Sequence, residues 1–438
     1  MAELVPTAAI DLWEEWPALP EAERVARFKA LPHDEADDFF LSLDPAEQGN
    51  LLFALPAGER RLWLRLLAPD DVADMIQAVP QAERPALLDL LDDATLREVR
   101  ALLAYEEDAA GGLMSPRFAR TRPDMTVDEA ISYLRKQAAQ VETIYYAYVL
   151  DDEQRLKGVV SFRELFQKPG DTHIRDIMHT ELVTVREEMD QESVARVYLE
   201  QDLLAIPVVD AEGRMKGIIT YDDIADVVRE EDTEDVQKLG GMSSALEEPY
   251  LTAPLADLIK KRAGWLAALF LGEMLTATAM SHYETEIASA VVLALFVPLI
   301  ISSGGNSGSQ ATTLVIRAMA LGEVRLRDWW RVLRREVSAG MVLGAVLGTI
   351  GLARILVWHF VGGSYGPHYA VVAATVAVSL VGVVLWGSVT GAMLPFVLRR
   401  LGFDPASASA PFVATVVDVT GLIIYFTVAS IILRGSLL

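Results

Sequence analysis

The sequence predicts a multidomain membrane protein with an all-α superhelical N-terminal domain, an α/β tandem pair of modules and an α-helical transmembrane domain of five helices. Residues 1–262 contain 28 Lys and Arg against 54 Asp and Glu, whereas residues 263–438 contain 10 against 8. Two kinds of internal repeat fill the acidic part, and five long apolar runs fill the rest. A strongly charged, patterned half joined to an apolar half is typical of a membrane protein with a large water-exposed region.

The first domain, residues 1–110, is predicted to be an acidic helical superhelix. Proline recurs every 11 to 13 residues, at Pro20, Pro32, Pro45, Pro56, Pro69 and Pro80. Proline fits the first helical turn and acids favour it, so each unit predicts one short helix. Such helices bury their apolar faces only by stacking on neighbours. From the sequence of this domain alone, we expect Asp38, Asp70 and Asp74 to be helix-start acids on a solvated face.

A longer repeat follows in residues 113–229. Residues 149–165 match 208–224 at an offset of 59, and residues 114–130 match 178–194 at an offset of 64. The two offsets differ by five residues, which indicates an insertion in the first copy around residues 138–143. Each copy predicts strand, turn, strand and helix, and the pair resembles tandem cystathionine-β-synthase (CBS) domains, here residues 111–172 and 173–232.

The CBS resemblance implies a sensor of adenine nucleotides or ions. In such modules a Thr or Ser and an Asp before the last helix often hold a ribose. Thr220 and Asp223 occupy these places in the second copy, and Ser161 and Glu164 in the first. ATP is therefore a candidate ligand.

A dense acidic ridge leads from the second copy into a connecting helix and linker, residues 233–262. Helical spacing places Asp223, Asp226, Glu230 and Glu234 on one face, with Glu231 and Asp235 alongside. Like charges at this spacing repel, so the ridge is either solvated or binds cations. Its position on the link to the membrane favours cations, and oxygen ligands without Cys or His clusters indicate Mg²⁺ or Ca²⁺.

Five spans are predicted in the transmembrane domain, residues 263–438, and their loops predict the orientation. The spans are residues 263–281, 286–312, 337–360, 369–397 and 410–433. Basic loops alternate with loops that lack Lys and Arg, which predicts cytoplasmic N-terminal domains and an outside C-terminus. The N-terminus shows no cleavable signal, and the absence of cysteine excludes disulfides.

Polar residues within the spans predict an ion path. Asp418 lies near the middle of the last span, where an ionised acid costs about 2.5 to 3.5 kcal/mol, so we expect it to face a cavity, a partner or an ion. Span two carries Gly304, Gly305 and Gly308 among polar residues, which permits either close helix approach or a break that lines a cavity. We expect this span to line the pore, and Glu273 is a further acid in span one.

The whole chain resembles the MgtE family of Mg²⁺ transporters and channels. Domain order matches, as do PLIISSGGNSGSQATTLVIRA in span two, LRRLGFDPA, and PFVATVVDVTGLIIYF in the last span. The resemblance implies a homodimer in the lipid bilayer of the inner membrane, with a pore between the subunits. It also implies that Asp418 from each chain holds a largely hydrated Mg²⁺, assisted by Asn306 and by backbone oxygens near Ala414.

The resemblance also implies that cytosolic Mg²⁺ closes the pore by bridging the N-terminal domain, the CBS pair and the connecting, or plug, helix. The positions that match the family's ligands are Asp38, Asp70, Asp74, Gly112 by its carbonyl, Asp190, Asp202, Asp223, Asp226, Glu231, Glu234, Asp235 and Asp404. Two positions depart from the family pattern: Glu273 is unusual at its place, and Leu199 lies where a backbone contact is expected.

Two other classes of function fit parts of the sequence. A non-conducting membrane sensor of Mg²⁺ or adenine nucleotide explains the acidic half but leaves Asp418 without a role. The GNSG segment at residues 305–308 is similar to an intramembrane serine protease motif, yet every histidine lies outside the predicted spans or at a membrane rim. A serine nucleophile needs a base within reach, so we expect no enzyme activity, and no nucleic-acid partner.

Overall fold

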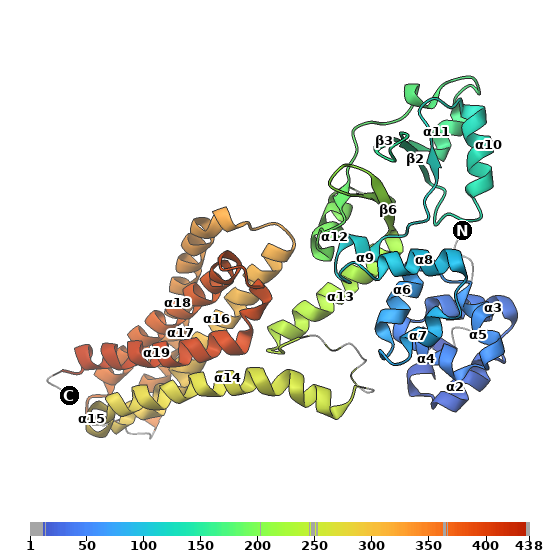
Figure 1. Ribbon diagram of the computed structural model, residues 1–438. Coiled ribbons are helices and arrows are strands. Elements are labelled where there is room, and N and C mark those ends of the chain that lie inside the picture. The colour runs from blue at the N-terminus through green and yellow to red at the C-terminus, as the bar shows by residue number, and fades with distance from the viewer. Residues whose placement is uncertain are drawn as a thin grey trace. The chain divides into compact units, whose positions relative to one another are not determined.

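The computed structural model describes residues 12–434 except 14, 202, 245, 247–249, 251–252, 362–364 and 366. The chain forms two compact units, Met1–Arg229 and Glu230–Leu438 (Figure 1). The all-α N-terminal part and the two small mixed sheets lie in the first unit, and the five long apolar helices lie in the second. The predicted fold class is confirmed.

The N-terminal part of the first unit is a series of short helices. Five of the six prolines begin a helix as predicted, at Pro20, Pro32, Pro45, Pro56 and Pro69. The helices are η1 (Trp16–Ala18), α2 (Glu21–Phe28), α3 (His33–Ser42), α4 (Pro45–Ala54), α5 (Ala57–Leu64), α6 (Pro69–Ala78), α7 (Arg84–Leu88) and α8 (Asp93–Leu102).

Pro80 is the exception to the predicted pattern. A turn follows it, and α7 begins only at Arg84, with Pro85 in its first turn. A helix that began at residue 81 would carry Pro85 in its interior, where proline removes a backbone hydrogen bond and clashes with the preceding turn. In the first turn of α7 the missing N–H of Pro85 has no cost.

One hydrophobic core joins the N-terminal helices to the second α/β repeat. Phe28, Phe39 and Trp63 pack ring against ring, with Phe28 and Trp63 centroids 4.8 Å apart. The same buried cluster continues through Met75 to Ile224 on α13. Each such large apolar side chain gains about 1.5–3 kcal/mol on burial, so this shared core stabilises the N-terminal helices together with the second α/β repeat.

The two α/β repeats have the same topology, which confirms the duplication. In the first, β1 (Arg120–Thr121) pairs in parallel with β2 (Tyr146–Leu150), which pairs antiparallel with β3 (Leu156–Ser161). In the second, β4 (Val185–Arg186), β5 (Ala205–Val209) and β6 (Met215–Thr220) repeat that order. The remaining elements are α9 (Ala110–Leu113), α10 (Val127–Gln137), α11 (Phe162–Gln167), η2 (Ile174–Asp176), α12 (Gln191–Glu200) and α13 (Tyr221–Leu239).

Helix α13 continues without interruption through the predicted boundary at residues 232/233. It contains no Gly or Pro to stop it, and it ends at Gly240–Gly241, where Gly241 has a φ of +85°. Glycine adopts this left-handed conformation without a Cβ clash and commonly ends helices. The predicted connecting segment, residues 233–262, therefore includes the end of α13 and the first two turns of α14 (Leu255–His282).

Among its described residues, the second unit contains five helices that are long and apolar enough to cross a membrane. The first, third, fourth and fifth are α14, α17 (Trp329–Val361), α18 (Tyr369–Arg400) and α19 (Ala410–Ile432). The second span consists of η3 (Val291–Phe296) and α16 (Val297–Ala320), after the short α15 (Glu284–Ser289). It begins at Val291, later than the predicted residue 286, and Pro298 fits the first turn of α16. The short helices η4 (Leu326–Asp328) and η5 (Pro405–Ser407) complete the unit.

Helices α16, α18 and α19 form the centre of the second unit (Figure 1). Their buried residues include Ile300, Val376, Val417 and Tyr425, whose hydroxyl donates to the carbonyl oxygen of Leu293 at 2.8 Å. Helix α14 packs along α19 but has no buried residue of its own. Apolar helix faces that no other helix covers are what contact with lipid requires.

Glycines at the crossing of α16 and α18 bring the two backbones together. A Cβ on Gly308 would lie 3.0 Å from the carbonyl oxygen of Gly387, and one on Gly391 would collide with the carbonyl oxygen of Gly308. Helix α16 runs unbroken through Gly304, Gly305 and Gly308. Of the two roles open from the sequence, the structure adopts close helix approach, as small residues allow in membranes.

Candidate functional site

The predicted pore residues gather where α16 meets α19. Asp418 is half-buried on α19, one turn after Ala414. A Cβ on Gly305 of α16 would lie 3.5 Å from Cβ of Ala414 and 3.9 Å from Oδ1 of Asp418. The α16 backbone at Gly305 therefore lies close beside Ala414 and the Asp418 carboxylate.

Asn306 and Glu273 border the same region. Asn306 follows Gly305 on an exposed face of α16, where Ser302 Oγ accepts a long 3.5 Å hydrogen bond from its amide. Glu273, exposed on α14, lies close enough to Asp418 for the two carboxylates to repel. Carboxylates and an amide on helices that lipid surrounds are expensive unless water or a cation reaches them.

A second site lies in the first unit, where α6 meets the start of α13. Asp70 is 5% exposed, and its Oδ1 atom is buried without a hydrogen-bond partner. Burial raises the pKa of Asp70 well above its usual range, and the charges of Asp223 and Glu142 raise it further. A buried carboxylate oxygen that lacks a donor and faces other carboxylates is suited to a cation.

Asp223 is tied to the end of β6. Its Oδ2 atom accepts hydrogen bonds from the backbone N–H of Thr220 at 2.8 Å and from Thr220 Oγ1 at 2.9 Å. Burial raises the pKa of Asp223 to about 7, although the bond from the Thr220 N–H opposes this shift. The sequence predicted both Asp70 and Asp223 as regulatory ligands, and the structure brings the two together.

Three further carboxylates near Asp70 and Asp223 were not predicted from the sequence: Asp71, Glu142 and Asp222. Asp71 interacts electrostatically with Asp222 and Asp226, and Glu142 with Asp71 and Asp222. Ser115 Oγ donates to Glu142 Oε2 at 3.1 Å, which fixes this side chain. We call Asp70, Asp71, Glu142, Asp222, Asp223 and Asp226 the acidic cluster. Glu142 lies in the insertion at residues 138–143, so that insertion was the available signal.

The other predicted regulatory residues are distributed more widely. Gly112 lies on α9. Ala109, the residue before α9, forms an isolated antiparallel β-bridge with Asp190. Asp38 is exposed on α3, and Asp226 forms a 2.7 Å ion pair with Arg229. Asp74 lies on α6, and Glu231 and Asp235 lie on α13. Asp202 lies outside the described residues.

Glu234 and Asp404 are brought together by a lysine. Lys238 Nζ lies 2.7 Å from Glu234 Oε1 and 2.7 Å from Asp404 Oδ2. Asp404 also caps η5, because its Oδ1 accepts from the N–H of Ala406 at 2.8 Å.

The two candidate nucleotide positions differ in what holds them. In the first copy, Glu164 accepts from Ser161 Oγ at 2.8 Å, and its other oxygen contacts His179 Nε2 at 2.6 Å. In the second copy, Asp223 accepts from Thr220 and belongs to the acidic cluster. A ribose at Thr220 and Asp223 would therefore compete with a cation for the same carboxylate.

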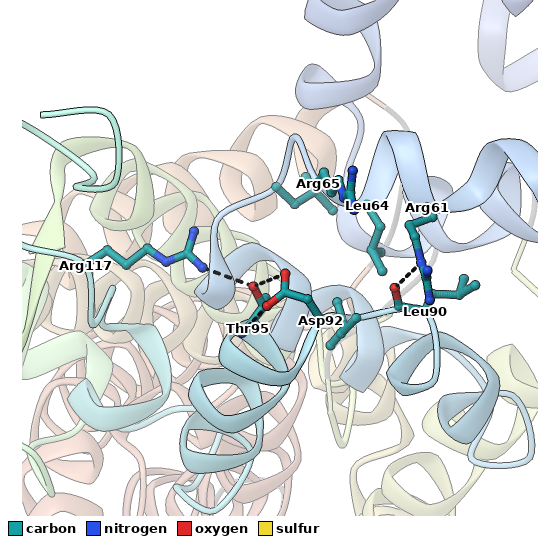
Figure 2. A pocket seen from close by; sticks show the side chains of 9 residues that line it. Arg61, Leu64, Arg65, Leu90, Asp92, Thr95 and Arg117 are labelled. Atoms are coloured by element: carbon teal, nitrogen blue, oxygen red, sulfur yellow. Dashed lines mark hydrogen bonds between the residues drawn. The ribbon is translucent and has the colours of Figure 1, made fainter. Parts of the chain in front are cut away.

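A separate surface cavity of about 420 Å³ lies between α5 and α8 (Figure 2). Arg61 Nε donates to the Leu90 carbonyl at 3.0 Å, and Arg117 donates to Thr95 and Glu98. The cavity contains none of the predicted ligand residues, and the guanidinium groups of Arg61 and Arg117 already bond to the protein.

Within the part of the chain that the structure describes, no three Asp, Glu or His side chains are spaced to hold a metal ion directly. The acidic cluster therefore brings its carboxylates within range of mutual repulsion without enclosing an ion. Side-chain rotation or a largely hydrated ion would be needed to join them, as Mg²⁺ readily allows because it keeps several waters.

Family profiles match the chain in order. A profile described as the MgtE intracellular N domain matches residues 7–108, a CBS domain profile matches residues 110–170 and 174–230, and a divalent cation transporter profile matches residues 297–428. The curated magnesium transporter MgtE of Thermus thermophilus is 44% identical, over 80% of this chain and 75% of that protein. That of Enterococcus faecalis is 35% identical, over 77% of this chain and 72% of that protein.

Solved structures are also similar. The cytosolic domain of the Mg²⁺ channel MgtE in complex with ATP is 44% identical with a TM-score of 0.48, and the match covers 50% of this chain and 90% of that structure. The soluble part of a magnesium transporter is 30% identical with a TM-score of 0.41, and the match covers 51% of this chain and 93% of that structure.

Proposed function

This chain belongs to the MgtE family of magnesium transporters, and on that premise we propose that it conducts Mg²⁺ through a pore that cytosolic Mg²⁺ closes. The observation that carries the proposal is the position of Asp418, a half-buried carboxylate within an apolar span, close to Gly305 of α16. A hydrated cation that passes this carboxylate would offset its desolvation.

The pore is proposed to lie between two copies of the chain in the inner membrane. In a single chain Asn306 and Glu273 are exposed beside Asp418. A second copy related by a twofold axis would present the same groups, so the two Asp418 side chains would form one acidic site. Asn306 and backbone oxygens near Ala414 would contact the ion's water shell, since Mg²⁺ loses its water reluctantly.

The acidic cluster is proposed to be part of the gate. Asp70 and Asp71 come from the N-terminal helices, Glu142 from the first α/β repeat, and Asp223 from α13. Without a cation these carboxylates repel, which favours separation of the elements that carry them. Mg²⁺ would bind more tightly when these elements lie together, so bound Mg²⁺ would favour that arrangement. Helix α13 would transmit this change of arrangement toward the spans.

Three further features complete the proposal. The acidic first unit and α13 would face the cytoplasm, and the C-terminus would lie outside, because the basic loops alternate. ATP would bind the α/β pair at Thr220 and Asp223, where hydroxyl and carboxylate lie 2.9 Å apart. Asp38, Asp74, Gly112, Asp190, Asp202, Glu231 and Asp235 are proposed as additional regulatory positions. Glu234 and Asp404 are not proposed as Mg²⁺ ligands, because each pairs with Lys238.

Mg²⁺ flux tests the proposed function. The purified chain is placed in liposomes that contain a fluorescent Mg²⁺ indicator. Mg²⁺ is added outside the liposomes, and the Mg²⁺ concentration inside them, on the side that corresponds to the cytosol, is set beforehand. We expect uptake at low cytosolic-side Mg²⁺ and inhibition at millimolar levels. A protein that binds Mg²⁺ but gives no more flux than empty liposomes would be a non-conducting sensor instead.

A further inference from the structure

The C-terminal end of α13 is held against the loop between α18 and α19 by one lysine. Lys238 bridges Glu234, one turn earlier on α13, and Asp404, which is 166 residues away in the sequence. Its side chain is 20% exposed. Burial alone lowers the pKa of Lys238, but the hydrogen bonds to Asp404 and Glu234 outweigh it and raise that pKa to about 12.

Apolar and backbone contacts surround this ion pair within the second unit. Leu239 packs on Ile316, Ala406 and Ala408. The N–H of Ser243 donates to the carbonyl oxygen of Lys261 at 3.1 Å, and its hydroxyl donates to the same oxygen at 2.8 Å. The end of α13 is therefore docked on α16, on the loop before α19 and on α14.

The lysine supplies the charge that this docking needs. Both carboxylate oxygens lie 2.7 Å from one nitrogen, so they are at most 5.4 Å apart. At that distance two partly buried carboxylates repel unless a cation lies between them. The sequence predicted Glu234 and Asp404 as ligands of a regulatory Mg²⁺, yet the Lys238 ammonium occupies the position between them.

We propose that Lys238 is a built-in counter-ion that takes the place of a divalent cation between Glu234 and Asp404. The end of α13 then stays docked on the membrane-spanning unit when Mg²⁺ is absent, and cation-dependent movement begins on its N-terminal side. The inference rests on the proposed function only in treating α13 as part of a gate. The docking itself is independent of transport.

Hydrogen–deuterium exchange of the full-length protein in detergent or lipid nanodiscs tests the inference. The reporter is the Ser243 amide, which donates to the Lys261 carbonyl and so connects the residues after α13 to α14. In EDTA the wild-type amide should stay protected. In Lys238→Met it should exchange at least about tenfold faster, and millimolar Mg²⁺ should restore protection because two carboxylates then face each other without a counter-ion.

Two variants serve as controls, and a third separates charge from shape. Lys238→Arg should behave as wild type, and Lys260→Met, at an exposed lysine on α14, should change nothing. Asp404→Asn should also expose the Ser243 amide, but Mg²⁺ should not restore it, since only one carboxylate remains. Amides of α18 residues 376–384, most of which are buried, report whether each variant is folded.

Three results would overturn the inference: an unprotected Ser243 amide in wild-type protein in EDTA, wild-type exchange in Lys238→Met, or no rescue of Lys238→Met by Mg²⁺. Because exchange does not depend on flux, a protein that failed to conduct Mg²⁺ but showed the expected pattern would refute the proposed function alone.

Discussion

Gly387 on α18 lies so close to Gly304 on α16 that a Cβ at residue 387 would collide with the carbonyl oxygen of Gly304. The same relationship recurs one turn later between Gly391 and Gly308. Because lipid provides no hydrophobic drive for helix association, such close packing is what holds these two helices together.

Gly387→Ala should therefore destabilise the second unit. A methyl group in a fully packed contact forces the backbones apart and typically costs about 1–3 kcal/mol. Thermal unfolding in detergent should show a lower Tm. The matched control is Gly264→Ala on α14, where a Cβ would meet nothing within 4 Å. Equal Tm values for the two variants would contradict the packing argument.

Asp418→Asn should abolish most Mg²⁺ flux while the protein remains folded. The amide keeps the shape of the carboxylate but removes the charge that attracts a hydrated dication. A loss of about 1.4 kcal/mol in ion binding already lowers occupancy about tenfold. Uptake into indicator-loaded liposomes measures the effect, and Asp257→Asn, in the first turn of α14, is the control. Selective flux that survived in Asp418→Asn would exclude this residue from the pore.

Stability in EDTA should decrease as pH rises from about 5 to 7. An aspartate ionises near pH 3.9 in an unfolded chain, whereas the pKa of Asp223 is about 7 in the folded protein. Between these values the folded state binds more protons than the unfolded state, so stability falls with rising pH and levels off above about pH 7. Tm values at pH 5.5 and 7.5 measure it.

The variant Asp223→Asn should reduce the difference between those two Tm values, whereas Asp152→Asn, at an exposed turn, should not. A Tm that rises with pH over this range in wild-type protein would show that Asp223 is ionised throughout. Asp70, Asp71 and Glu142 shift in the same direction, so Asp223→Asn should reduce the slope without removing it.

Glu142→Gln should make the protein more stable without Mg²⁺ and less responsive to it. Glu142 repels Asp71 and Asp222, and neutralising it removes this repulsion together with one anionic oxygen for the ion. The measurement is the Tm increase between EDTA and millimolar Mg²⁺. Glu181→Gln, an exposed glutamate outside the cluster, is the control. If both variants respond to Mg²⁺ as wild type does, the insertion contributes nothing to the cation response.

Neutralising Asp223, Asp226 and Glu231 together should weaken inhibition by cytosolic-side Mg²⁺. The three acids lie on α13, and their loss removes charge that a bridging ion requires. In the liposome assay the concentration that halves the flux should rise at least about tenfold, while flux at low Mg²⁺ is unchanged. Unchanged inhibition would mean that the acidic face of α13 is simply solvated.

Much of the fold could be predicted because it depends on local patterns. Prolines at a regular spacing determined where α2 to α6 begin, and the sequence repeat determined the matching strands of the two small sheets. Pro80 was misjudged because Pro85, five residues later, fits a first turn better. The role of Gly304 and Gly308 stayed open, since a glycine allows both a break and a close approach, and only the facing Gly387 and Gly391 decide between them.

The sequence by itself determined the architecture and the five apolar spans, because periodicity, charge and apolar length act through neighbouring residues. Only the tertiary structure decided which charges meet. Glu142 joined the acidic cluster, and Lys238 joined Glu234 to Asp404, because long-range packing brings together side chains whose sequence separation gives no sign of it. Electrostatic energy depends on distance in space, and the chain's order does not contain that distance.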